Sequence, residues 1–167
     1  MFSWGASLLK ESWHNLHSSW MQTQAKNLNV FEVRLRSTDV NGLLVPAIRA
    51  SYMIQYKNGL ISKHFKTLMQ VAAFHLRDLV TPEQLALNMA IGSLGALLWM
   101  GEIDNLEIYL DDLTILINNV LDAFTAIDPS KILVKIKLHL LKHLPDNIRR
   151  FGLAVRFATE QPPSSQP

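Results

Sequence analysis

Apolar residues recur at helical spacing along most of this chain, and the pattern predicts an all-α or nearly all-α fold, an irregular multi-helix bundle. The two strongest stripes, at steps of three and four residues, lie within 62–79 and 106–124. The first comprises Phe65, Leu68, Met69, Ala72, Leu76 and Leu79, and the second Leu106, Leu110, Leu113, Ile117, Val120, Leu121 and Phe124. Each stripe is wide enough to cover one face of a core helix.

Local signals place several helix starts. Ser62 is expected to cap the first strong helix. Thr81 can accept a backbone N–H at the N-cap of the next one, Pro82 suits the first helical position, and Gln84 stands where a capping box requires Glu or Gln. Asp104 is expected to cap the helix after that.

The first third of the chain differs in composition, because it holds three of the four tryptophans, at positions 4, 13 and 20. Trp13 and Trp20 share a helical face with Leu9 and Leu16, which predicts a helix over about 7–25 whose aromatic stripe packs in the core. Residues 30–36 alternate apolar with charged side chains, which predicts one short edge strand or, as the alternative, an irregular connection. A turn at 37–42 and a short helix closed by Asn58-Gly59 are expected next.

The stretch 85–100 contains no charged residue. It is shorter than the roughly 20 apolar residues that a membrane span needs, so a fully buried core helix is the better interpretation and no membrane span is expected.

Composition bounds the remaining choices. At 167 residues the chain fits one domain by length, and its pattern divides into an N-terminal helical segment at 1–58, a helical domain at 59–160 and a disordered tail at 161–167. Charged residues make up only 18%, so apolar surface is expected to meet another protein or a missing chain. The absence of cysteine and of a signal segment favours an intracellular protein, in the nucleus or the cytoplasm.

No residue set predicts an enzyme. His139 and His143 have the spacing of a zinc pair, but Leu140 replaces the glutamate of that motif and no third ligand is evident. The acidic pairs at Asp111-Asp112 and at 102 and 104 are better explained as solvated helix faces. No glycine-rich phosphate loop follows a strand. We therefore predict no catalytic residue, no metal site and no cofactor.

The best electrostatic signal lies near the end of the chain. Seven cations fall within 131–156, where Asp146 is the only acid. Such a cluster can neutralise backbone phosphates, although the same residues can simply cover a helix surface. The residues predicted to contact nucleic acid are Lys135, Lys137, Lys142, Arg149, Arg150 and Arg156.

The segment 135–152, KIKLHLLKHLPDNIRRFG, followed by Ala158-Thr159-Glu160, resembles part of large fungal proteins tied to transposable elements. That family has a Lys-Pro-Lys-x-His block, then His-Leu-Pro, Ile-Arg-Arg-Phe-Gly-Pro and Thr-Glu. This chain matches the pattern with two departures: Ile136 stands where a proline is usual, and Leu153 stands where Gly-Pro is usual after the arginines. Similarity extends upstream over 65–79 and 97–103, so that it covers about 63–160.

Members of that family continue past the Thr-Glu pair into a further helix, whereas this chain turns into a Pro- and Ser-rich tail. The resemblance implies a truncated or degenerate copy. It also implies that Glu160 corresponds to the last acid of a three-carboxylate site that holds two metal ions. Without its partner acids, Glu160 organises no metal.

Two functions follow as hypotheses. The first is a catalytically inactive helical fragment of a transposon-encoded protein that keeps some nucleic-acid binding. The alternative is a helical protein–protein interaction module, which would dock through the tryptophan-rich helix and the helix at 85–99. A membrane-associated protein is the least favoured class.

Overall fold

The computed structural model describes residues 3–42, 45, 47–130 and 136–153. These residues are helical and contain no strand, so the predicted all-α fold is confirmed. The helices are α1 (Ser3–Thr23), α2 (Ala25–Arg36), α3 (Ala50–Gln55), α4 (Ser62–Leu76), α5 (Pro82–Leu98), α6 (Leu106–Ile127), α8 (Ile136–Leu141) and α9 (Leu144–Phe151), with a 3₁₀ turn η1 at Lys57–Gly59.

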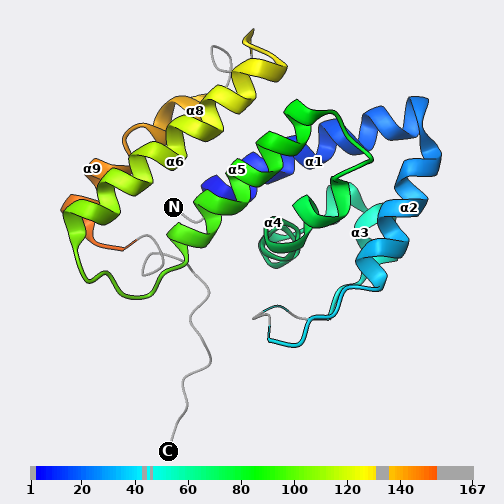
Figure 1. Cartoon of the computed structure of the whole chain (residues 1–167), viewed down its shortest axis with the longest axis horizontal. Coiled ribbons are helices and arrows are strands. Elements are labelled where there is room, and N and C mark those ends of the chain that lie inside the picture. Colours follow the sequence, from blue (N-terminus) through cyan, green and yellow to red (C-terminus); the bar gives the residue numbers. More distant parts are fainter. Residues whose placement is uncertain (1–2, 43–44, 46, 131–135, 154–167) are drawn as a thin grey trace, which may run out of the picture.

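The core runs through all of the longer helices. The helix α5 lies in the middle of the molecule, with α6 along one side, α1 behind it and α4 on the other side (Figure 1). Buried side chains from 8–60 and from 65–153 belong to one hydrophobic cluster. Described residues of the predicted N-terminal helical segment at 1–58 thus share a core with the rest, and the predicted tail at 161–167 lies outside the described residues.

The tryptophan-rich helix is a core element. Trp13 and Trp20 are 4% and 2% exposed, and both rings lie within 6 Å of the ring of Phe31, at 5.5 and 5.8 Å between centroids. The prediction of a core-facing stripe is confirmed for these two residues. Because burial of an aromatic ring removes it from any partner's reach, the hypothesis that this stripe docks a partner is wrong for Trp13 and Trp20.

The predicted strand at 30–36 is wrong, because these residues form the second half of α2. The alternation of apolar and charged residues fits a strand, but Leu28, Phe31 and Leu35 are also spaced by three and four residues. Those three are the buried ones, and Val33 remains 60% exposed. Burial against α1 and α4 therefore selects the helical period over the period of two.

One of the three predicted helix caps is confirmed, the one at the start of α5. At α5 the Thr81 hydroxyl accepts the Gln84 backbone N–H at 3.3 Å, and the Gln84 side chain accepts the Thr81 N–H at 3.2 Å, so the capping box is confirmed. At α6 the cap is Asn105, one residue after the predicted Asp104; its side-chain oxygen accepts two backbone N–H groups. Ser62 is the first residue of α4 and not its cap.

Gly152 follows the end of α9 as expected, at φ +88°. The predicted closure at Asn58-Gly59 is a 3₁₀ turn without a positive φ, because Gly42 and Gly152 are the residues with positive φ in the described chain. None of the described helices is long and apolar enough to cross a membrane.

Candidate functional site

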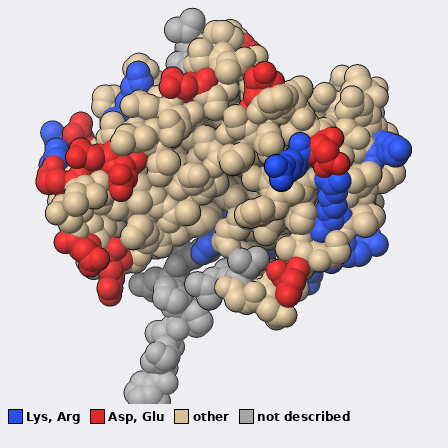
Figure 2. Space-filling model, viewed as in Figure 1, with Lys and Arg blue, Asp and Glu red and all other residues tan. Residues whose placement is uncertain are grey.

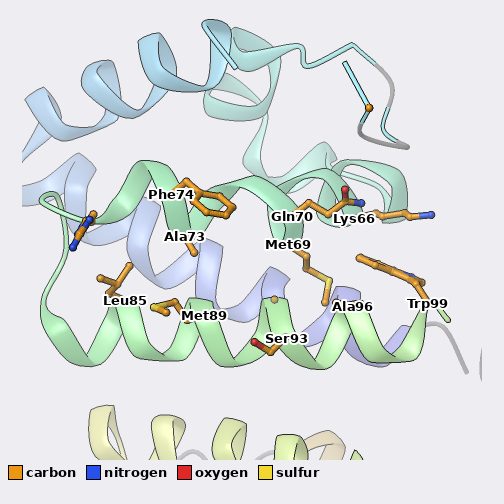
Figure 3. Close-up of a pocket in the computed structure, with 13 residues that line it drawn as sticks. Lys66, Met69, Gln70, Ala73, Phe74, Leu85, Met89, Ser93, Ala96 and Trp99 are labelled. Carbon is orange, nitrogen blue, oxygen red and sulfur yellow. The ribbon is translucent and has the colours of Figure 1, made fainter. Parts of the chain in front are cut away.

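A groove lies between α4 and α5 on the described surface. Its volume is about 990 Å³. The α4 side contributes Met69, Ala73 and Phe74, and the α5 side contributes Leu85, Met89, Ser93, Ala96 and Trp99, so both helices line it (Figure 3). Grooves of this size that are lined mainly by apolar side chains are the usual sites for ligands and for docked helices.

Glycines bring the two helices close together beneath the groove. A Cβ at Gly92 would lie 3.0 Å from the backbone oxygen of Met69, and one at Gly95 would overlap the Met69 side-chain terminus. Neither position leaves room for a larger residue without movement of α4 or of Met69. Gly92 and Gly95 of α5 thus form the floor of the groove, and Met69 of α4 packs against them.

Two apolar side chains at the groove stand largely in solvent. Phe74 is 80% exposed and Met89 is 56% exposed. Exposed large apolar residues that are scattered singly need no explanation, but these two line one apolar groove. The prediction that 85–100 forms a fully buried helix is wrong on this face, because Met89, Ser93 and Ala96 of α5 are exposed.

The charges around the groove have one sign. Lys66 and Arg77 line it, and no carboxylate does. The Lys66 ammonium lies 5.1 Å from the centroid of the Trp99 ring, so a cation–π contact holds it beside the groove. Arg77, the C-cap residue of α4, lies eleven residues after Lys66, which corresponds to about 16 Å at the helical rise.

The surrounding surface is polarised in the same sense. From 40 to 77 the sequence has five lysines and arginines and no acid, whereas from 102 to 128 it has seven acids and no lysine, arginine or histidine. Figure 2 shows most acidic side chains toward α6 and most basic ones toward α2, with a broad uncharged area between them. A ligand of the groove therefore meets a positive rim.

The residues predicted to bind nucleic acid are only partly described. Lys135 and Arg156 lie outside the described residues, as does Glu160, and Lys137 lies within α8. Lys142, Arg149 and Arg150 are exposed. The Arg149 guanidinium donates to the Glu107 carboxylate of α6 at 2.6 Å, so one of these three cations is already paired with an acid. Nucleic-acid contact by this block stays a prediction.

His14 and His17 of α1 connect helices in the described part of the chain. The Nε2 of His17 donates to the carbonyl of Ile54 at 2.8 Å, and that of His14 to the carbonyl of Lys57 at 3.0 Å, which ties α1 to α3 and η1. Burial lowers the pKa of His17 below its ordinary value. His139 and His143 are exposed, with ring centroids 6.4 Å apart.

No group of three or more potential metal ligands occurs among the described residues. No family model, no curated protein and no solved structure was found to match this chain. The resemblance to transposon-encoded fungal proteins therefore stays a prediction, as does the absence of catalysis.

The helix at 85–99, expected as a docking face, supplies the α5 side of the groove. The α4 side was not predicted, because sequence gives the apolar face of a helix and not what covers it. One signal was available: Phe74 lies outside the stripe of Phe65, Leu68 and Ala72, on a turn of α4 that also carries no acid. An apolar aromatic on the wrong face of an amphipathic helix is a hint of a docking surface.

Proposed function

We propose that this protein is a helical protein–protein interaction module whose α4/α5 groove binds an apolar helical segment flanked by carboxylates. The observation that carries the proposal is the combination of Phe74 and Met89, both largely exposed, with a lining that includes two cations and no acid. Helices that dock in grooves insert apolar anchors at steps of three and four residues. Charges at the ends then select the partner and its orientation.

A helical occupant fits the shape of the site. The groove runs along two packed helices and is open to solvent, and Lys66 and Arg77 lie on nearly the same face of α4. An amphipathic helix whose acids are separated by about three turns would place one carboxylate near each cation. Its apolar stripe would cover Phe74 and Met89 and remove them from water.

The test compares two fluorescently labelled amphipathic peptides that share one leucine stripe. One carries glutamates eleven residues apart beside the stripe, and the other carries lysines there. Two partly screened ion pairs of about 0.5–1 kcal/mol each favour the acidic peptide by roughly tenfold. Anisotropy titrations measure both dissociation constants. Equal affinity for the two peptides, or no binding of either, would contradict the proposal.

Variants locate the binding surface. Met89→Asp places a charge in the groove, so we expect it to abolish binding of the acidic peptide. Val33→Asp is the matched control, because Val33 is similarly exposed and lies on α2, away from the groove lining. We expect it to bind as the unchanged protein does. Loss of binding in both variants would show that the peptide does not select the groove.

A further inference from the structure

The outer face of α6 carries the features that the groove requires of a partner. Ile108 and Ile115 are 60% and 56% exposed and stand two turns apart. Asp111 and Asp122 are exposed on the same stripe and are eleven residues apart, which is again about 16 Å along a helix. Lys66 and Arg77 beside the groove have the same separation.

We infer that the partner of the α4/α5 groove is the outer face of α6 from a second copy of this chain. The inference rests on the proposed function and names its ligand. In the docked arrangement Ile115 enters the apolar groove beside Phe74, and the two aspartates lie near Lys66 and Arg77. The pairing joins an acidic surface to a basic one, as the polarised charge distribution favours.

Within one copy this contact cannot form. The inner face of α6, including Leu110, Leu113 and Ile117, is buried, and α6 packs along α5. Ile108 and Ile115 lie on the opposite side of α6, so they point away from the α5 of their own chain. Neither Asp111 nor Asp122 has an ion pair with another described residue. The stripe is thus available to a neighbouring molecule.

The interface joins two different patches, so it is heterologous. A copy whose groove is filled still presents its own α6 stripe, and a copy whose stripe is bound still has an open groove. Heterologous contacts close into rings or extend into chains. We therefore expect the mass in solution to rise with concentration beyond that of a dimer, starting from a monomer of 18.9 kDa. High salt is expected to weaken the association.

Charge reversal tests the pairing with the full-length chain. The first variant, Lys66→Glu with Arg77→Glu, gives an acidic groove beside the acidic stripe. The second, Asp111→Lys with Asp122→Lys, gives a basic stripe beside the basic groove. Each variant alone places like charges across the interface, so light scattering after size exclusion is expected to find monomers. An equimolar mixture restores opposite charges at both contacts and is expected to associate again.

Lys10→Glu with Lys26→Glu is the control, since it changes net charge by the same amount at exposed positions outside the groove lining. We expect it to associate as the unchanged protein does. A monomeric wild-type chain at every concentration overturns the inference, and so does a mixture that stays monomeric. If the wild-type chain is monomeric but binds the acidic peptide, the groove keeps its function and only the identity of its partner is wrong.

Discussion

Replacing Phe74 by alanine should separate folding from binding. The ring is 80% exposed, so only about a fifth of it contributes to the fold. Full burial of a phenylalanine side chain stabilises by about 1.5–3 kcal/mol, and a fifth of that is roughly 0.5 kcal/mol. Leu94→Ala is the contrasting change, because Leu94 is 1% exposed and its removal leaves a cavity that costs about 2–5 kcal/mol.

Phe74→Ala should weaken binding of the peptide more than it weakens the fold. If a docked helix covers the remaining four-fifths of the Phe74 ring, then the alanine variant loses about 1–2 kcal/mol of binding free energy. That loss corresponds to a dissociation constant weaker by roughly five- to thirtyfold. The protein itself should remain folded, since the core beneath α4 is unchanged.

Stability is measured by urea unfolding monitored with circular dichroism. Affinity is measured by anisotropy titration with the acidic peptide. We expect the unfolding midpoint of Phe74→Ala to lie close to that of the unchanged protein and far above that of Leu94→Ala. Two results refute the reasoning. Equal destabilisation by both variants would place Phe74 in the core, and unchanged peptide affinity would place the binding surface elsewhere.

Three further predictions concern stability and nucleic acid. Because burial lowers the pKa of His17, the unfolded chain binds a proton at a pH where the folded chain does not. The free energy of unfolding should therefore be highest above the ordinary pKa of 6.5 and should decrease as the pH falls below it. His17→Gln should reduce this decrease, measured as urea midpoints between about pH 7.5 and 5. Thr81→Ala removes the α5 cap and should cost about 1 kcal/mol, seen as a melting temperature lower by roughly 2–4 °C, whereas an unchanged melting temperature would argue against the cap. If the C-terminal basic block binds duplex DNA, Glu107→Gln should increase the affinity at low salt, because it frees Arg149 from its ion pair. Arg150→Ala should reduce the salt dependence of the DNA-binding constant. If the protein does not bind DNA at low salt, the nucleic-acid hypothesis is wrong.

Sequence predicted the helices whose signals are local. The start of α5 needs only a threonine, a proline and a glutamine at fixed offsets, and all three act there as expected. The stripes of α4 and α6 are long enough to exclude other periods. Residues 30–36 predict a strand through their alternation, but Leu28, Phe31 and Leu35 fit the helical period equally well. Only the packing of Phe31 against Trp13 and Trp20 decides between them.

The groove depends on contacts that no local pattern encodes. Its floor exists because Gly92 and Gly95 meet Met69 across a helix pair, and its opening exists because no described element covers Phe74. A charge-free sequence such as 85–100 fits a helix buried on all sides and equally one with a docking face. The basic block near the end was visible in the sequence, but its pairing with Glu107 joins residues 42 positions apart.

The claim that the α4/α5 groove receives a partner is tested most directly by methyl NMR of the protein labelled at its six methionines. Addition of the acidic peptide is expected to shift the resonances of Met69 and Met89, which line the groove. The resonances of Met21 and Met53 are expected to stay in place, because Met21 lies on α1 and Met53 is buried in α3. Unmoved signals from Met69 and Met89 at saturating peptide, or shifts confined to Met21, would contradict it.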